Sequence, residues 1–329
     1  MPDLYEVAAI GNAIVDVIAP ATDAFLAENG LDKGAMMLVD PARSAALYAK
    51  MAAGVEASGG SAANTIAGLA SFGGRGAFMG KVADDQLGEV FAHDMRAIGA
   101  RFENAPLVGG PGTAISMINV TPDAQRTMCT YLGASVEFTD SDVDAATVEA
   151  AKIVYLEGYL FDAEAARRAF AKAAGLAHGA GRMIALTLSD GFVVERHRGG
   201  LMGFIESQVD LLFANETELT ALFQTDDFDA AIEALRPHVK LAAVTRGAAG
   251  SVILSQGERL TVKAEAVEKV VDTTGAGDQY AAGFMFGLSR GRSLQQCGQL
   301  ASLAAAEVIS HYGPRPLVSL KDLAAGQGY

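Results

Sequence analysis

Apolar runs of strand length alternate with longer, helix-like patterns along most of the chain. Tyr5–Ile10 is a short apolar run closed by Gly11, which predicts a buried strand. Asp40 followed by Pro41 is typical of a helix N-cap and first turn. Further strands are predicted at 77–79, 153–156, 183–188, 211–213, 241–245, 251–254 and 259–262, and helices at 41–51, 61–72, 86–98, 163–177, 276–289 and 293–310. This alternation predicts an α/β fold, with a mainly parallel, doubly wound sheet flanked by helices on both faces.

One stretch, residues 102–132, has no good helical pattern and predicts a small β excursion. Residues 113–120 and 127–132 have strand patterns and flank the turn sequence Thr121-Pro122-Asp123. Apolar stretches at 13–19 and 35–39 are expected to join the same excursion. Because no linker, repeat or low-complexity tail divides the chain, we expect a single domain over residues 1–329. A small β-rich lid would be formed by inserted segments at about 13–39 and 102–132.

The composition is that of a globular protein with an acidic excess. Half of the 329 residues are apolar, and 39 Asp and Glu against 25 Lys and Arg give a formal charge of −14. This balance argues against a nucleic acid or an anionic membrane as the main partner, because both attract clustered basic side chains. The chain shows no signal-peptide pattern at its start, no apolar run of membrane-spanning length, and only two cysteines. These features predict a cytoplasmic protein.

Common phosphate-binding and hydrolase motifs are absent. After Gly80-Lys81 the chain has Val82, where a Walker A motif requires Ser or Thr. Gly275-Ala276-Gly277 continues with Asp278, Gln279 and Tyr280, so it is not a GxGxxG dinucleotide fingerprint. No GxSxG elbow occurs. The sequence therefore argues against a P-loop NTPase, a Rossmann dehydrogenase and an α/β-hydrolase.

The segment 272–278 (DTTGAGD) is a stronger indication of a catalytic site. It follows the strand-like pair Val270-Val271 and leads into an apolar helical pattern. Gly and Ala at a helix entrance leave backbone N–H groups unobstructed, and the helix dipole adds partial positive charge, so this backbone can bind a phosphoryl group. Asp278 adds a carboxylate that can accept a proton from an attacking hydroxyl. A plain loop with a helix-dipole charge is the alternative, but the whole string between a strand and a helix favours the catalytic interpretation.

Four segments together resemble the PfkB/ribokinase family of carbohydrate and nucleoside kinases. The 272–278 string is similar to the C-terminal signature of that family. Residues 59–64 (GGSAAN), followed by further glycines, resemble its N-terminal signature. Residues 215–218 (NETE) look like its NxxE motif, and 245–250 (TRGAAG) like its nucleotide loop. The motifs occur in the order of the family and span essentially the whole chain, so the resemblance implies a ribokinase-like fold and kinase activity.

The resemblance also implies roles for individual positions. Asp278 is the catalytic base, and the backbone of Gly275, Ala276 and Gly277 forms the anion hole. The acceptor site is assigned to Asn12, Asp16, Gly59, Gly60 and Asn64, and the nucleotide site to Asn215, Glu218, Thr245, Gly247 and Gly250. ATP is the co-substrate, and Asn215 and Glu218 are expected to act on Mg²⁺ through water. Asp272 and Thr274 resemble a monovalent-cation site, which would bind K⁺, and Arg126 in the lid turn would swing toward the phosphates on closure.

Several of these positions also have simpler interpretations from the residues alone. Asn215 and Glu218 are spaced as a helix capping box, and the glycines of 245–250 are compatible with an ordinary turn. Asn64 could make a helix-turn hydrogen bond, and Asp16 could be a charge at a strand end. Arg126 could be a solvated side chain of the lid.

The acceptor is less firmly indicated than the reaction. GNAIVD near the start and the lid sequence 126–135 look closest to the adenosine-kinase branch, a purine-salvage activity that converts adenosine and ATP to AMP and ADP. Animal-type members carry two aromatic residues after a glycine, whereas this chain has Gly158-Tyr159-Leu160. Met36, Met37 and Phe161 are possible apolar substitutes for the missing ring, although residues of this kind are more often part of the core. A sugar kinase for ribose or fructose, and a non-catalytic sugar- or nucleotide-binding regulator, stay open, as does a monomer or a homodimer.

Overall fold

The computed structural model describes residues 4–123 and 125–329. Within these residues, eight strands form a large sheet in the order β13-β12-β11-β10-β9-β8-β1-β5. Their bounds are Tyr5–Ile10 (β1), Gly76–Met79 (β5), Ala151–Glu157 (β8), Met183–Thr187 (β9), Leu211–Asn215 (β10), Leu241–Thr245 (β11), Ser251–Ser255 (β12) and Glu258–Val262 (β13). All pairs from β5 to β11 are parallel, and β12 and β13 add an antiparallel hairpin at one edge. The predicted, mainly parallel α/β sheet is confirmed.

Side chains of the central strands alternate between two hydrophobic cores. In β1, Ala8 and Ile10 face one core, and Val7 and Ala9 face the other, because successive side chains of a strand point to opposite faces. The first core is covered by helices Ala145–Ala150 (α5), Glu164–Gly179 (α6), Gly191–Gln208 (α7), Glu216–Phe223 (α8) and Phe228–Leu235 (α9). The second is covered by Ser61–Ser71 (α3), Gln86–Ala97 (α4), Ala276–Ser289 (α10) and Leu294–Ile309 (α11), and Leu320–Gly326 (α12) packs on α11. The part of the chain that the structure describes contains no helix long and apolar enough to cross a membrane.

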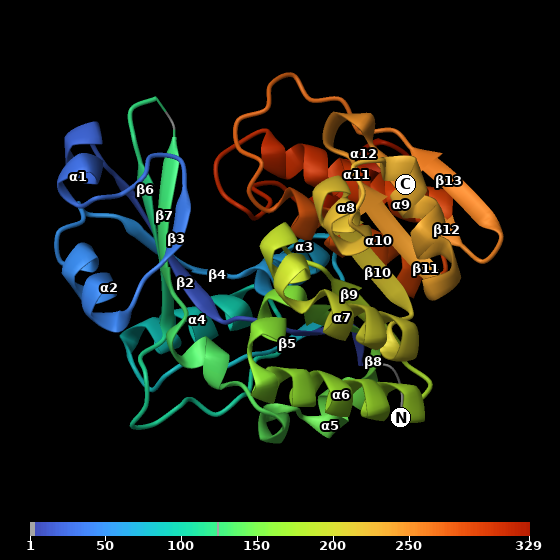
Figure 1. Cartoon of the computed structure of the whole chain (residues 1–329), viewed down its shortest axis with the longest axis horizontal. Coiled ribbons are helices and arrows are strands. Elements are labelled where there is room, and N and C mark those ends of the chain that lie inside the picture. The colour runs from blue at the N-terminus through green and yellow to red at the C-terminus, as the bar shows by residue number, and fades with distance from the viewer. Residues whose placement is uncertain (1–3, 124) are drawn as a thin grey trace.

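A second sheet forms the lid. Its five strands, counted over the described residues, lie in the order β3-β7-β6-β2-β4. Their bounds are Ile14–Pro20 (β2), Met36–Leu38 (β3), Val55–Gly59 (β4), Ala114–Val120 (β6) and Arg126–Tyr131 (β7). The predicted antiparallel pairing across the turn at 121–123 is confirmed, with Val120 opposite Arg126. Figure 1 shows this sheet standing apart from the large one, with Asp23–Glu28 (α1) and Pro41–Tyr48 (α2) on its outer side.

Several local features differ from the expectations from sequence, among them the short helices α1, α5, α9 and α12, which were not predicted. The pair Val270-Val271 is not a strand: it lies in a loop, where the Val271 N–H donates to the Ile309 carbonyl (2.8 Å). β4 was not predicted, because its sequence VEASG has little β propensity, and it is held in place by antiparallel pairing with β2. α7 was not predicted either, because it contains four glycines and a kink at His197.

Candidate active site

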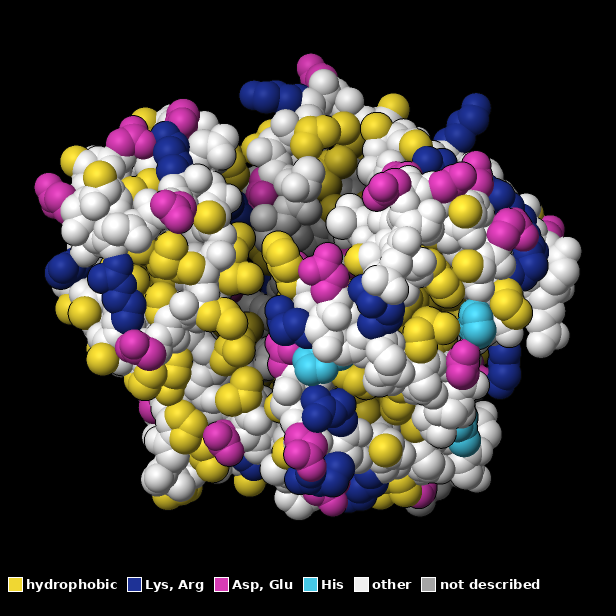
Figure 2. Space-filling view, in the orientation of Figure 1, with side chains coloured by type: hydrophobic (Ala, Val, Ile, Leu, Met, Phe, Trp, Pro, Cys, Tyr) yellow, Lys and Arg dark blue, Asp and Glu magenta, His cyan; other side chains and the backbone are white. Residues whose placement is uncertain are grey.

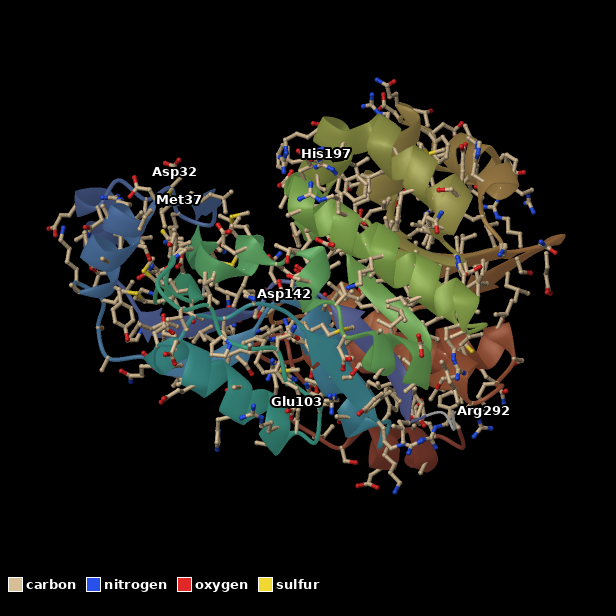
Figure 3. The ribbon with its side chains drawn as sticks, turned by 90° about the horizontal axis from the view of Figure 1, so that it is seen from below. Asp32, Met37, Glu103, Asp142, His197 and Arg292 are labelled. Atoms are coloured by element: carbon tan, nitrogen blue, oxygen red, sulfur yellow. The ribbon has the colours of Figure 1, made fainter. Side chains whose placement is uncertain are left out.

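A cavity of about 670 Å³ lies between the lid and the carboxyl ends of the parallel strands. Glu157, Asn215 and Thr245, which end β8, β10 and β11, line it from the large sheet. The lid supplies the opposite wall from β2, β3, β6 and β7. Figure 2 shows the hollow between the lid and the part of the molecule built on the large sheet. Figure 3 labels Met37 on the lid side and His197 on the α7 side. Ligands of open α/β sheets bind at the carboxyl ends of strands, so this cavity is the candidate active site.

The N-terminus of α10 opens into this cavity. Residues 273–278 all line it, and α10 begins at Ala276 after Gly275. Gly275 has φ +79°, and a Cβ at this position would lie 2.6 Å from the Pro314 backbone, so only glycine fits the turn without strain. A Cβ built on Gly277 would have no heavy atom within 4 Å. The backbone of the first helical turn is therefore accessible from the cavity, as an anion site requires.

Asp278 lies in the first turn of α10 and projects into the same space. Its Oδ1 accepts a hydrogen bond from Ser61 Oγ (2.6 Å), and its Oδ2 accepts one from Asn64 Nδ2 (3.3 Å). Burial raises the pKa of Asp278 to about 6, against the opposing effect of these two hydrogen bonds and of the Arg315 charge. Asp278 is thus an oriented carboxylate that can change protonation state near neutral pH.

Asp16, on β2, faces Asp278 from the lid side of the cavity. Burial raises the pKa of Asp16 to about 6, the charges of Arg315 and Arg126 lower it, and the charge of Asp278 raises it further. Gly59 packs directly on this carboxylate, since a Cβ there would lie 2.3 Å from Asp16 Oδ2. Asp16 and Gly60 line the cavity. The residues assigned to the acceptor site therefore lie together at the cavity, although Gly59 and Asn64 lie behind the cavity surface.

Glu157 is a functional candidate that the sequence analysis missed. It is 1% exposed, at the end of β8, and lines the cavity. Its Oε1 accepts a hydrogen bond from Asn12 Nδ2 (2.8 Å), and its Oε2 accepts one from the Ala62 N–H (2.9 Å). Burial raises the pKa of Glu157 to about 7. The signal in the sequence was a single acid ending an apolar strand just before Gly158. Ser61 lies within the 59–64 segment but was not singled out, and Arg315 had no comparable signal.

Asn215 and Glu218 form the capping box that was the simpler interpretation of their spacing. The Asn215 N–H donates to Glu218 Oε2 (3.0 Å), Asn215 Nδ2 donates to Oε1 (2.7 Å), and the Glu218 N–H donates to Asn215 Oδ1 (2.8 Å). Both residues also line the cavity, so the cap places them beside the anion site. Burial raises the pKa of Glu218 to about 7, and the charges of Asp190 and Asp278 add to the effect.

The nucleotide loop at 245–250 is only partly at the cavity. Thr245, at the end of β11, lines the cavity. Gly247 and Gly250 are not among the described residues that line it. Gly247 begins a short 3-10 turn that ends at Ala249, and Gly250 leads into β12. A nucleotide contact of these two glycines therefore stays a prediction.

Arg126 is not a solvated lid residue. It begins β7, its side chain is 9% exposed, and Nη1 lies 2.7 Å from Asp272 Oδ2. Asp272 Oδ1 also accepts hydrogen bonds from the N–H and Oγ1 of Thr274, and Oδ2 accepts one from the Gly313 N–H (3.1 Å). This ion pair joins the lid to the loop before α10. Because the Asp272 carboxylate already pairs with a cation, it fits a bound K⁺ poorly in this arrangement.

Large apolar side chains line the cavity from both the lid and the large-sheet side, and together they form its apolar wall. Met36, Leu38, Val136, Tyr159 and Phe192 line it and are 36–71% exposed, which is unusual for large hydrophobic side chains gathered around one hollow. Of the candidate substitutes for the missing ring, Met36 lines the cavity. Met37 packs against the second core, because alternate residues of a strand face opposite sides, and Phe161 is buried in the first core. These two residues therefore have the simpler interpretation, as parts of the core.

The donor set fits a phosphate-bound metal ion rather than one held by a protein cage. No group of three or more His, Cys, Asp or Glu side chains suited to a metal occurs within residues 4–123 and 125–329. Glu218 offers one carboxylate near the anion site. Mg²⁺ usually keeps several waters and binds through one or two carboxylates plus substrate phosphates, which this arrangement can provide.

Comparisons with known proteins extend over the whole chain. A family model described as pfkB family carbohydrate kinase matches residues 34–320. The structure is similar to that of a probable sugar kinase protein from Rhizobium etli CFN 42, at TM-score 0.92 and 48% identity over 100% of this chain and 99% of that one. It is also similar to adenosine kinase from Sinorhizobium meliloti, at TM-score 0.91 and 54% identity over 99% of each chain. Adenosine kinase of Saccharomyces cerevisiae is 28% identical over 328 residues, which cover 93% of this chain and 95% of that protein.

Proposed function

The chain belongs to the pfkB family of carbohydrate kinases, and from this premise we propose that it transfers the γ-phosphoryl group of ATP to the 5′-hydroxyl of a nucleoside, with adenosine as the preferred acceptor. Its ribokinase-like fold is shared with the Rhizobium and Sinorhizobium structures. It is a phosphotransferase that acts on a hydroxyl group of a sugar or a nucleoside. The choice of acceptor and the roles of individual residues are the proposal.

Asp278 is the proposed general base. The acceptor oxygen attacks the γ-phosphorus, the bond between the γ-phosphorus and the bridging oxygen breaks, and its electron pair leaves with ADP. Asp278 accepts the hydroxyl proton as transfer proceeds. Its position at the cavity, with both oxygens oriented by Ser61 and Asn64, supports this role.

The first turn of α10 is the proposed anion hole. Backbone N–H groups of Gly275, Ala276 and Gly277 would stabilise the charge on the transferred phosphoryl group, because fixed dipoles need no reorganisation during the reaction. Mg²⁺ bound with ATP would neutralise charge on the β- and γ-phosphates. A requirement for K⁺ stays a prediction, checked by comparing activity in KCl and in NaCl.

The apolar wall is the observation that favours a nucleoside over a free sugar. A nucleobase can cover the exposed Met36, Leu38 and Phe192 side chains while Asp16 accepts hydrogen bonds from ribose hydroxyls. A free sugar carries hydroxyls around its ring, and those facing this wall would lose their hydrogen bonds to water without replacement. The similarity to the adenosine kinase of Sinorhizobium meliloti supports the same choice.

A sugar kinase is the second candidate. It is favoured by the similarity to the probable sugar kinase protein of Rhizobium etli and by Asp16, which can bind any vicinal diol. The two candidates differ in whether binding energy comes from the apolar wall or from polar contacts alone.

A panel of acceptors separates these candidates. Acceptor-dependent ADP release would be measured with Mg-ATP and adenosine, inosine, guanosine, ribose or fructose. Methyl β-D-ribofuranoside is the matched acceptor, because it keeps the furanose ring and the 5′-hydroxyl but lacks the base. We expect kcat/KM for adenosine to exceed that for the methyl riboside by about a hundredfold or more, since an aromatic base buries a large apolar area. Equal values, or a free sugar as the best acceptor, would exclude the nucleoside assignment.

A further inference from the structure

Arg315 is a partly buried cation behind the candidate site, in the loop between α11 and α12. Nε donates a hydrogen bond to Asn64 Oδ1 (3.1 Å), and Nη1 donates one to Ser58 Oγ (2.8 Å). Asn64 belongs to α3 and Ser58 to β4 of the lid. A single guanidinium therefore connects the lid, the helix behind the acceptor site and the C-terminal loop.

The contact with Asn64 reaches Asp278 through one side chain. Asn64 uses Oδ1 to accept from Arg315 and Nδ2 to donate to Asp278 Oδ2 (3.3 Å). Because an amide has a fixed division of acceptor and donor, the Arg315 bond selects the amide orientation that turns Nδ2 toward Asp278. Without Arg315, the amide could rotate and present its oxygen to the carboxylate.

Within residues 4–123 and 125–329, Arg315 makes no direct ion pair of the kind that Arg126 makes with Asp272. Its two hydrogen bonds go to an amide oxygen and a hydroxyl, and Nη2 is buried with no hydrogen-bond partner among the described residues. A buried charge is costly unless opposite charges lie near it. The opposite charges that act on Arg315 are those of Asp16, Asp94 and Asp278, and two of these acids, Asp16 and Asp278, line the cavity.

Most other charged groups near Asp278 are acids. The titratable side chains that face it electrostatically come from β2, β8, the turn after β8 and α8, and they are Asp16, Tyr155, Glu157, Tyr159 and Glu218. Arg126, whose charge acts on Asp16, is paired with Asp272. Arg315 is the cation whose charge acts on both Asp16 and Asp278.

We propose that Arg315 is a positioning residue for phosphoryl transfer, which fixes the Asn64 amide against Asp278 and keeps Asp16 and Asp278 ionised in the same cavity. This inference rests on the kinase function proposed above. The guanidinium has two separable contributions. Its fork connects Asn64 to Ser58, and its charge offsets the repulsion between the two acids.

Three variants separate these contributions. Arg315→Met removes the fork and the charge, Arg315→Lys keeps the charge without the fork, and Arg259→Met is a matched control that removes an arginine from β13, where it pairs with Asp229. The readouts are the pH profile of kcat/KM, kcat itself, and the melting temperature of each protein.

We expect Arg315→Met to move the acidic limb of the kcat/KM profile upward by about one pH unit, since a nearby opposite charge lowers a carboxyl pKa by one to three units. Arg315→Lys should return the limb toward its wild-type position while kcat stays below wild type, because an ammonium cannot bridge Asn64 and Ser58. Arg259→Met should match wild type. A wild-type acidic limb in Arg315→Met, or a limb in Arg315→Lys no different from that of Arg315→Met, would overturn the proposal.

A second measurement does not depend on activity. In protein with ¹³C-labelled aspartate carboxyls, the Asp16 and Asp278 signals would be assigned with Asp16→Asn and Asp278→Asn. They would then be titrated in wild type, in Arg315→Lys, which keeps a cation in the fold, and in Arg315→Met. Higher midpoints of the Asp16 and Asp278 carboxyls in Arg315→Met than in Arg315→Lys support the charge role. This result would hold even if no acceptor of the panel is phosphorylated, and such inactivity would overturn only the proposed function. Equal midpoints in an active kinase would remove the Arg315 proposal and leave the function standing.

Discussion

Four of the carboxyl groups that line the cavity have a raised pKa. Burial raises the pKa of Asp16 and Asp278 to about 6 and that of Glu157 and Glu218 to about 7. Groups this close titrate as a set, so a kinetic pKa belongs to the set rather than to one residue. The cavity can therefore hold protons at a pH where isolated carboxyls would be ionised.

The first prediction concerns the pH dependence of the reaction. A general base must be ionised, and a pKa raised to about 6 means that the active form is lost as the pH falls through 6. We expect kcat/KM to be flat above pH 7 and to fall with an acidic limb near pH 6. A profile flat down to pH 4.5 would show that no raised carboxyl takes part in the reaction.

A second prediction concerns Glu157. A carboxyl with a pKa of about 7 in the fold and 4.5 as its ordinary value stabilises the folded state at low pH, and this contribution is lost as the pH rises from 4.5 to 7. Glu157→Gln cannot ionise, and the Asn12 amide can rotate to accept from the introduced amide. The unfolding free energy of wild type should fall between pH 5 and pH 8. We expect this fall to be about 1–3 kcal/mol smaller in Glu157→Gln.

Urea unfolding at the two pH values measures this difference. Glu164→Gln, on the exposed face of α6, is the control and should follow wild type, because exposed ion pairs contribute little. A Glu157→Gln variant whose stability depends on pH as steeply as wild type would show that Glu157 is ionised in the fold throughout this range.

At the scale of elements, the chain encodes its regular parts locally. Strand and helix patterns predicted β1, α3, α4 and α10, and the Asp40-Pro41 cap predicted the start of α2, where Asp40 accepts from the Arg43 N–H. β4 and α7 were missed because pairing with β2 and packing on the first core, rather than propensity, hold them in place. The Val270-Val271 pair is apolar but does not form a strand, because the Val271 N–H donates to the Ile309 carbonyl at the end of α11 instead of to a neighbouring strand.

The entrance of α10 allows a matched pair of substitutions. Gly275→Ala forces a side chain into a left-handed φ and onto Pro314, so it should lower stability by about 1–3 kcal/mol. Gly277→Ala adds a methyl group to open space in the cavity. It should keep the wild-type melting temperature and reduce kcat by roughly tenfold to a hundredfold, because the methyl group displaces the phosphoryl group from the N–H donors.

Thermal melts and steady-state kinetics on both variants check this prediction. Full activity in Gly277→Ala would place the phosphoryl group elsewhere than at the start of α10. A melting temperature unchanged by Gly275→Ala would contradict the structural argument at that turn.

At the scale of the whole molecule, the site depends on contacts between residues far apart in the sequence. Asp278 is bonded to Ser61 and Asn64, which lie 217 and 214 positions away. Family motifs could place Asp278 and Asn64 in one site, but no local pattern could pair Asn64 with Arg315 or Asn12 with Glu157. The first pairing joins α3 to the loop after α11, and the second exists because β1 and β8 are neighbours in the sheet.

The lid and the body are joined by the Arg126–Asp272 ion pair, which Tyr312 covers from its ring face (5.4 Å to the ring centre). Arg126→Met should loosen the lid, and hydrogen exchange of β7 amides should accelerate about fivefold or more, as expected for a local loss of 1 kcal/mol. Lys33→Met is the control, because Lys33 makes exposed ion pairs with Asp23 and Asp123 within the lid. Equal exchange rates in wild type and Arg126→Met would show that this ion pair does not hold the lid.

The central claim is that Asp278 takes the proton from a nucleoside hydroxyl during phosphoryl transfer. Its most direct test measures AMP formation from adenosine and Mg-ATP by wild type and by Asp278→Asn, together with the adenosine Kd of each protein. The account predicts a loss of kcat of about 10²–10⁴-fold with little change in Kd or melting temperature. Wild-type turnover in Asp278→Asn would contradict it.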